Sequence, residues 1–511
     1  MVALSAATSR HIPAVAARPY NWSFFNIHPF SFTGVWNNQT YHAEAWLRLI
    51  CVNQTTSLAR MVVSLHSAPF ITVSPEGVHS LVPPELFDNS SSLPQLWFQS
   101  IDDDVSVTAG QLTNYDELIK RHEDAAQLIY GALLPAELPF TLRMQGSERV
   151  HMVQRQCGPA KHPLFADKSA WLGMMDATTV TAYGDYTDAW ATHNSGSSGT
   201  AAALNSSSLN SSSSSSGQQM DFRRRGEVLR FLTLQHLQHH RALGFAGSLM
   251  VVTRHTAEAI MASRPLRRAM QRQRLVLVLW DLGLEPRASH FMQVPAYNLM
   301  RLAAWGSEVH LGFWDLDEYL VLPSHKSISE EIHNGCLSRT LGREPEAIVP
   351  TMWVSSNSWN ATPELEGWMR AGYWSRAVQD MDYAMWPYTF CDGACKSLVD
   401  PTTDLMFQVH QHARPPPRRS LLPISWRCGY LLHFYQLWSR RMPGLMAGMG
   451  YKDPPAIPGI PLIMEDILPQ SALQRLASMA KLYKEIIASN PSLQLAAEAA
   501  APAEVAVQQR R

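Results

Sequence analysis

The most constraining feature of this chain is a regular alternation of helical and strand-like patterns between residues 227 and 323. In chain order these predicted segments are a helix at 227–243, a strand at 248–252, a helix at 257–273, a strand at 275–282 and a helix at 289–305. Gly244 is placed to end the first helix. Strands that alternate with helices of this length predict an α/β fold with a parallel, doubly wound sheet.

The alternation leads into an acidic break at 309–323, which reads VHLGFWDLDEYLVLP. One apolar run stops at Asp315, and a second apolar run begins directly after Glu318. This pattern predicts a buried strand that carries carboxylates at its end, followed by a second strand. In open α/β sheets ligands bind outside the carboxyl ends of the strands, so these carboxylates would lie where a ligand binds.

The spacing of the acidic residues suggests a metal site. Asp315 and Asp317 are two apart, so in an extended strand both side chains would lie on one face and Glu318 on the other. Two hard oxygen donors suit Mn²⁺ or Mg²⁺, ions that usually bind together with substrate phosphates. The alternative is an inert, solvated acidic turn. Carboxylates held between strongly apolar strands are costly unless they are paired or bound to metal, which favours the metal site.

The rest of the chain divides by composition. We predict a β-rich N-terminal portion at 1–110, a mixed connecting region at 111–194, a Ser-rich disordered linker at 195–217, an α/β domain at 218–476, and a helix end with an Ala-rich tail at 477–511. Within the connecting region, apolar spacing predicts a helix over 115–134. Further strands are expected at 347–354, 396–399, 405–410 and 431–435, and a helix at 327–337.

Charge and cysteine usage narrow the function classes. The net charge of −1 offers no field for nucleic acid, so we expect no nucleic-acid partner. Cys391 and Cys395 have a spacing that could suit zinc, but no second pair completes a tetrahedral set. A disulfide or free thiols are therefore the favoured interpretations.

N-glycosylation sequons indicate a secretory compartment. Of the seven N-x-S/T sequons, those at Asn21, Asn38 and Asn53 lie in aromatic-containing sequence that is expected to fold. Residues 1–20 contain no apolar core long enough for a signal peptide, and no run of about 18 apolar residues occurs. A membrane-associated protein whose anchor is not in this sequence and a soluble protein both remain open.

Several motifs, in order, resemble those of glycosyltransferase family 92. The resemblance covers roughly 222–440 and is carried by EVLRFLTLQHLQHHRALGF, SLMVV, LVLVLWDL, QVPAYNLM, the D-x-D-E-aromatic form of the acidic break, KSLVDP followed by QVH, and LLHFYQLW. It implies a GT-A-like fold with a doubly wound mixed sheet. It further implies Mn²⁺-assisted transfer of a hexose, galactose from UDP-galactose, to a glycan acceptor with inversion. The implied location is the luminal face of a Golgi or other secretory membrane.

The resemblance and the residue chemistry together predict which residues form the functional site. The predicted metal ligands are Asp315, Asp317, His410 and His433, and the predicted substrate-binding residues are Gln293, Asn298, Trp314 and Glu318. Lys396 could neutralise the charge on the departing nucleotide, or be an exposed loop lysine. Asp392 is the candidate general base for the acceptor hydroxyl, with Glu366, Asp380 and Asp382 as competitors and a turn-forming aspartate as its alternative. The alternative for each late histidine is a structural role, which is the more frequent one for a lone histidine at a strand end.

Two other classes fit the same pattern. A non-catalytic glycan-binding or scaffold protein could retain the GT-A fold, and a metal-dependent hydrolase could use a D-x-D-E break at a strand end. A hydrolase would bring further carboxylates or histidines from neighbouring strands, and the predicted strand at 275–282 offers only Asp281.

Overall fold

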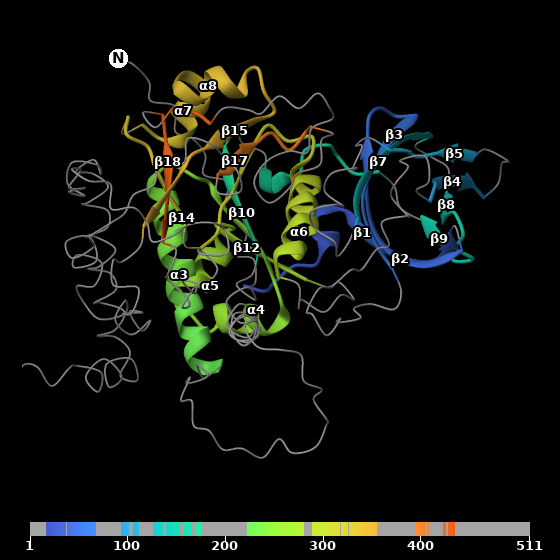
Figure 1. Ribbon diagram of the computed structural model, residues 1–511, viewed down its shortest axis with the longest axis horizontal. Helices are drawn as coiled ribbons and strands as arrows, with labels where there is room; N and C mark the ends of the chain where they lie inside the picture. Colours follow the sequence, from blue (N-terminus) through green and yellow to red (C-terminus); the bar gives the residue numbers. More distant parts are fainter. Residues whose placement is uncertain are drawn as a thin grey trace, which may run out of the picture.

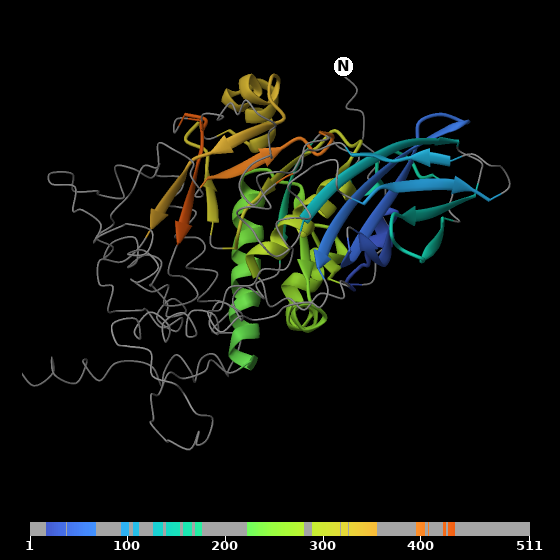
Figure 2. The ribbon, with the colours of Figure 1, turned by 45° about the vertical axis from the view of Figure 1, so that its right-hand side comes forward.

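The computed structural model contains four β-sheets and describes most of the first 434 residues. The described residues are 17–36, 38–67, 94–101, 106–111, 126–135, 139–153, 157–165, 169–175, 222–280, 289–316, 318–324, 326–354, 395–403, 407, 423–425 and 428–434. Two sheets from the N-terminal third lie together on one side, and the helices α3 to α8 with the other two sheets lie on the other side (Figures 1 and 2).

Among the described residues of the N-terminal portion, the regular structure is β apart from two short 3-10 helices, Trp22–Phe25 and Pro163–Phe165. A five-stranded antiparallel sheet has the order β1 (Ile27–Trp36), β2 (Gln39–Cys51), β3 (Thr56–Ser67), β7 (Ala126–Pro135) and β6 (Gly110–Gln111). A four-stranded sheet has the order β5 (Ser106–Thr108), β4 (Leu96–Ser100), β8 (Phe140–Met144) and β9 (Val150–Val153). In β4 and β8 every second residue is buried, as expected of strands with one face in a core. These strands lie in the stretch 1–110 that was predicted to be β-rich and continue beyond it to Val153, and the predicted boundary stays a prediction.

A six-stranded mixed sheet forms the centre of the molecule. Its order is β12 (Leu275–Leu279), β11 (Gly247–Val252), β10 (Ala170–Met175), β13 (His310–Phe313), β17 (Lys396–Val399) and β15 (Glu346–Val349). The first four strands are parallel, and β17 is antiparallel to both of its neighbours. Taken in chain order the parallel strands run 3-2-1-4, so the strand order reverses between β10 and β13.

Helices cover both faces of this sheet. On one face lie α3 (Phe222–Ala242), α4 (Arg254–Met261) and α5 (Arg264–Gln271), and on the other lies α6 (Ser289–Ala304). All residues of β11 are buried, and alternate side chains belong to the hydrophobic cores on opposite faces of the sheet. Such a strand requires helices on both faces. Leu249 and Val251 pack in the core that includes α6, while Met250 and Val252 pack in the core that includes α3 to α5. The predicted α/β class with helices on both sides is confirmed.

A small three-stranded sheet continues from the acidic break. Its order is β14 (Glu318–Val321), β18 (Tyr430–Phe434) and β16 (Thr351–Val354). It shares a core with α7 (Ile328–Asn334) and α8 (Cys336–Leu341), in which Leu320, Ile332 and Leu337 are buried. Ser327 and Glu330 form a capping box that fixes the start of α7.

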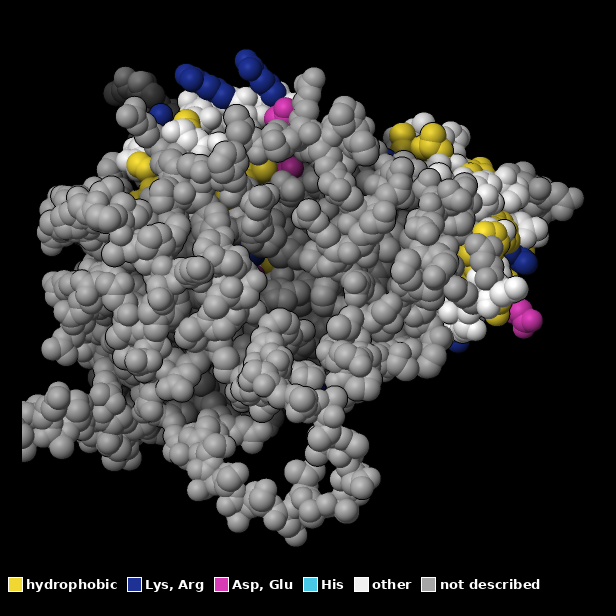
Figure 3. Space-filling view, in the orientation of Figure 1, with side chains coloured by type: hydrophobic (Ala, Val, Ile, Leu, Met, Phe, Trp, Pro, Cys, Tyr) yellow, Lys and Arg dark blue, Asp and Glu magenta, His cyan; other side chains and the backbone are white. Residues whose placement is uncertain are grey.

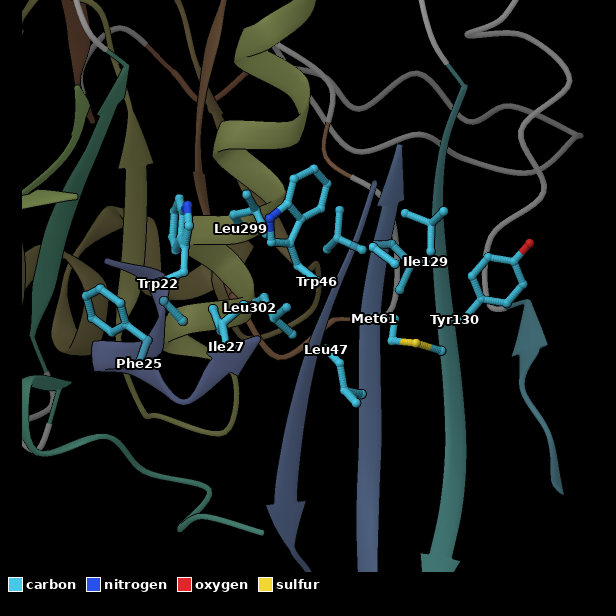
Figure 4. Close-up of a cluster of buried hydrophobic side chains, with 14 of the residues drawn as sticks. Trp22, Phe25, Ile27, Trp46, Leu47, Met61, Ile129, Tyr130, Leu299 and Leu302 are labelled. Carbon is cyan, nitrogen blue, oxygen red and sulfur yellow. The ribbon is translucent and has the colours of Figure 1, made fainter. Parts of the chain in front are cut away.

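The β-rich portion and the central sheet share one continuous core. Figure 4 shows Trp46 of β2 beside Leu299 of α6, while the adjacent Leu47 points to the other side of the sheet, toward Met61. Arg48 follows in β2, is 1% exposed, and donates to the backbone oxygens of Leu302, Ala303 and Trp305 at 2.8, 3.1 and 2.7 Å. Its second terminal nitrogen donates to the oxygens of Pro159 and Ala160. Arg48 therefore satisfies the carbonyl groups at the C-terminal end of α6, where a cation also complements the helix dipole.

Disulfides link distant segments. Cys51 pairs with Cys157, and Cys336 pairs with Cys428. Cys395 is also disulfide-bonded, which confirms the disulfide interpretation for this residue over zinc or a free thiol.

Two expectations about segments were wrong. The part of the predicted helix 115–134 that the structure describes is strand β7, which pairs with β3 along ten residues. The α/β domain does not begin at residue 218, because β10 at Ala170–Met175 lies in the middle of its sheet, between β11 and β13. The predicted linker 195–217 and the tail 477–511 lie outside the described residues.

Candidate functional site

The candidate site is the turn between β13 and β14, at the carboxyl end of the central sheet. Strand β13 ends at Phe313. The backbone amide of Glu318 donates to the backbone carbonyl oxygen of Asp315 at 3.0 Å, which closes the turn. A buried strand, an acidic break and a second strand therefore follow one another as predicted. The expectation of an extended strand through 315–317 was wrong, because residues 314–316 lie outside both strands.

Strand register brings Lys396 to this turn. Gly312 of β13 lies opposite Leu398 of β17, so continuing the antiparallel register places Lys396 beside the residues that follow β13. Its Nζ lies 2.8 Å from Oδ2 of Asp315 and 3.8 Å from Oε2 of Glu318. Lys396 is 2% exposed and belongs to a strand, so its interpretation as an exposed loop lysine was wrong.

Glu318 lies next to Asp315 and not on the opposite face. Its Oε2 accepts the backbone amide of Asp315 at 2.8 Å, and the residue is fully buried. The turn reverses the direction expected of the side chain, so the predicted separation of Glu318 from Asp315 was wrong. The cluster is asymmetric, since the side chain of Asp315 is 35% exposed while those of Lys396 and Glu318 are buried. Asp315 is therefore the member of the cluster that a ligand can reach.

Helix α6 holds the other oxygen of Asp315. Nε2 of Gln293 donates to Oδ1 at 3.3 Å, and the Tyr297 hydroxyl donates to the same atom at 3.4 Å. Gln293 was predicted at the site, whereas Tyr297 was not, although the two are four residues apart and share a helix face. Both oxygens of Asp315 thus have partners on fixed elements, which orients the carboxylate.

Asn298 and Trp314, predicted to bind substrate, have packing roles in the structure. The Asn298 amide donates to the oxygens of Val294 and Phe407 and accepts from the amide of Phe407, so it holds residue 407 against α6. Arg301, which sequence reasoning did not select, donates to Asn298 and to the Thr403 oxygen. Trp314 is fully buried and stacks on His240 with ring centroids 5.4 Å apart. Both side chains are buried in these contacts, and their role in substrate binding stays a prediction.

Three buried histidines of α3 attach the helix to β14. His236 and His239 hydrogen-bond through Nε2 to the oxygens of Glu318 and Leu320, at 3.1 and 2.7 Å. His240 receives the amide of Leu320 at Nε2 and uses Nδ1 toward the oxygen of His236. Since Nε2 of His240 accepts a proton donor, this ring is neutral. Burial, with His236 and His239 nearby, lowers the pKa of His240 well below its usual value. The histidines thereby fix the strand that begins at Glu318.

The remaining predicted residues are not placed. Asp317, Asp392 and His410 lie outside the described residues, as do Glu366, Asp380 and Asp382. The backbone of His433 lies opposite Glu318 in the β14–β18 pair, and its side chain is not described. These predictions stay predictions.

The described residues offer one of the predicted metal ligands. Asp315 is a hard, partly exposed oxygen donor, so it fits a site for Mn²⁺ or Mg²⁺. Within the described ranges no group of three or more His, Cys, Asp or Glu side chains is arranged to hold a metal ion. The cation that does contact Asp315 is the Lys396 ammonium group.

Comparison with known proteins adds no relative. No family model matches this chain, and no curated protein matches it. Among the helices that the structure describes, none combines the length and the apolar character needed to span a membrane.

Proposed function

We propose that this protein is a glycosyltransferase that moves a hexose, galactose by resemblance, from a UDP-sugar to a glycan acceptor. The observation that carries the proposal is the position of the acidic turn. It follows β13 directly, at the point where the strand order reverses between β10 and β13. Ligands of open α/β sheets bind outside the carboxyl ends of the strands at such a switch point.

The fold supports the same proposal. The four parallel strands in the order 3-2-1-4 match the first four of the 3-2-1-4-5-6 arrangement that binds dinucleotides in doubly wound proteins. We infer a GT-A-like fold for the central sheet, on this order and on the motif resemblance to glycosyltransferase family 92. The GT-A-like fold is a more specific assignment than the mixed α/β architecture that the strand order defines.

The roles proposed for the described residues follow from their contacts. Asp315, with Asp317, His410 and His433, would hold a divalent ion, which when bound would neutralise the diphosphate of the donor. Gln293 and Tyr297 orient the Asp315 carboxylate from α6. Lys396 keeps a positive charge beside Asp315 and Glu318, where it can also face a phosphate that approaches Asp315. The general base remains Asp392 by prediction, outside the described residues.

A non-catalytic glycan-binding or scaffold protein is the second candidate. The observation that favours it is the 2.8 Å ion pair between Lys396 and Asp315, since an ammonium group can neutralise the carboxylate without any metal. A protein that kept only the fold would retain this pair and lose donor turnover.

The secretory location is part of the proposal. Disulfides persist in oxidising compartments, and two link distant parts of this chain, Cys51 to Cys157 and Cys336 to Cys428. Together with the sequons, they support a luminal enzyme of the Golgi or another secretory membrane. Glycosidase treatment of the native protein should increase its electrophoretic mobility, and unchanged mobility would count against this location.

Donor turnover tests the function. The purified full chain is incubated with Mn²⁺ and a panel of UDP-sugars, and the release of UDP is measured with and without chelator. We expect metal-dependent UDP release from at least one donor, UDP-galactose first. Release of phosphate from simple phosphate esters would instead support the hydrolase, and absence of turnover with every donor would favour the scaffold.

A further inference from the structure

The outer face of α5 and the residues around it carry an arginine surface that the neutral overall charge conceals. We define it as Arg241, Arg264, Arg267, Arg268, Arg272 and Arg274. All are exposed except Arg274, which is half-buried. No lysine occurs among residues 241–274, and Glu258 is the only acidic residue there. A chain of net charge −1 therefore concentrates positive charge on one short helix and its flanks.

The arrangement on α5 is regular. Arg264, Arg267, Arg268 and Arg272 follow the helical spacing that places them on one side, while Leu266 and Met270 are buried on the other. Arg241, at the end of α3, joins this surface, because its pKa is lowered by partial burial and then by the nearby charges of Arg274 and Arg272. The guanidinium group of Arg241 therefore lies close enough to those of Arg274 and Arg272 for their charges to act on it.

No counter-charge compensates this repulsion in the part of the chain that the structure describes. The arginines of the surface form no ion pair there, and the contact made by Arg267 is to the backbone oxygen of Met261 at 2.7 Å. Like charges gathered without partners are unfavourable in the isolated protein, so an anionic ligand would gain by binding them. The surface also presents none of the exposed large apolar side chains, which excludes insertion into a lipid bilayer as its mode of binding.

The surface is separate from the acidic turn. Arg241 and Arg274 precede the amino ends of β11 and β12, whereas Asp315 follows the carboxyl end of the parallel strand β13. The arginine surface thus lies at the amino ends of these parallel strands, and the acidic turn lies at their carboxyl ends. A polymer bound to the arginines would not occupy the donor site.

We propose that the arginine surface binds a polyanionic polysaccharide that carries sulfate or carboxylate groups. The exclusive use of arginine suits this chemistry, because the planar guanidinium fork pairs two hydrogen bonds with one oxyanion. The disulfides favour an oxidising compartment, in which polyanionic glycans are available and nucleic acids are not. This binding surface does not depend on transferase activity.

The test measures binding of the full chain to dextran sulfate, with uncharged dextran as the reference polymer. A triple variant, Arg267→Gln, Arg268→Gln and Arg272→Gln, removes three exposed charges from α5 and the residue that follows it. We expect its affinity for dextran sulfate to fall roughly tenfold or more, since each exposed charge contributes modestly and the contributions combine. The dependence of affinity on salt should weaken at the same time, because fewer counterions are released on binding.

The matched control removes three exposed cations, Lys326 before α7, Arg339 in α8 and Arg343 after α8. Lys326→Gln, Arg339→Gln and Arg343→Gln cause the same change of net charge. Figure 3 shows dark blue side chains projecting at the upper edge of the molecule, where Figure 1 places α7 and α8. This control should bind dextran sulfate nearly as wild type does. A third variant with lysine at 267, 268 and 272 keeps the charge, and its affinity should lie between those of wild type and the α5 glutamine variant.

Four outcomes would overturn the proposal. They are equal binding of wild type to dextran and dextran sulfate, equal loss in both glutamine variants, no loss in the α5 variant, and tighter binding to RNA or to vesicles of anionic lipid than to dextran sulfate. Thermal unfolding of each variant is recorded alongside. If the glutamine variant is unstable, the three lysine substitutions test the same surface, because they too should weaken binding relative to wild type.

Discussion

Two buried cations have different partners: Arg48 lies at the C-terminal end of α6, and Lys396 lies beside Asp315, which α6 contacts through Gln293 and Tyr297. Arg48 contacts only backbone oxygens, those of Pro159, Ala160 and the last turn of α6. Lys396 contacts two carboxylates, one of which is 35% exposed. A cation surrounded by backbone oxygens has partners that cannot leave, whereas a cation paired with a partly exposed carboxylate can share it with a ligand. We therefore expect Arg48 to serve stability and Lys396 to serve the proposed donor site.

The largest effect on stability is expected at Arg48. Arg48→Met leaves several buried carbonyl groups without donors, and loss of a buried, hydrogen-bonded charge should lower the free energy of unfolding by about 3–5 kcal/mol. Arg48→Lys should recover only part of this, because an ammonium group cannot reach both sets of oxygens. Urea denaturation provides the measurement, with exposed Arg149→Met as a control expected to change stability by less than about 0.5 kcal/mol. Similar losses in Arg48→Met and the control would remove Arg48 as the structural contact.

A smaller loss is expected at Lys396. Lys396→Met leaves the buried carboxylate of Glu318 without its neighbouring cation and should cost about 2–3 kcal/mol, less than at Arg48 because Asp315 is partly hydrated. Adding Glu318→Gln removes the uncompensated charge, so the double variant should be more stable than the sum of the two single changes. A double-mutant cycle by urea denaturation should give a coupling of about 1–2 kcal/mol. Strict additivity would show that the two side chains do not interact in solution.

Acidification should weaken the structure around Arg48 and the contact of α3 with β14 by a still smaller amount. His162 lies near Arg48 and donates to the Phe24 oxygen, and burial lowers its pKa to about 4. In the unfolded chain the His162 imidazole binds a proton near pH 6.5, whereas in the folded chain it does so only near pH 4. The free energy of unfolding therefore falls as pH drops from about 6.5 to about 4. His240 acts in the same direction, since its pKa is also lowered. His162→Gln should show less loss of stability between pH 7 and pH 4.5 than wild type, by about 1–3 kcal/mol. An identical pH dependence would contradict this.

The sequence predicted the elements around the site better than the contacts within it. The acidic break, its flanking strands and α6 follow from continuous apolar runs and helical spacing, which are local patterns. The pairing of Lys396 with Asp315 spans 81 residues and depends on the register of β17 against β13. No local pattern encodes that register. The reversal of Glu318 depends on the turn, which two-residue alternation along a strand cannot describe.

The errors outside the site have similar physical causes. The segment 126–135 has apolar spacing compatible with a helix, yet β3 and β6 supply hydrogen-bonding partners on both sides and make it a strand. Strand β10 precedes the Ser-rich stretch in the chain but pairs with β11 and β13 that follow it. The predicted domain boundary was placed where the composition changes, so it separated β10 from the strands with which β10 pairs.

The central claim is that the acidic turn binds the donor, and metal-dependent donor binding tests it most directly. UDP-galactose is titrated at increasing Mn²⁺ into wild type, Asp315→Asn, Asp317→Asn and a control, Asp400→Asn, whose aspartate contacts Thr402 at the far end of β17. We predict that Mn²⁺ tightens binding to wild type and control, and that neither site variant responds, with turnover reduced on the order of 10²-fold. Unchanged metal-dependent affinity in both site variants would show that the donor binds elsewhere.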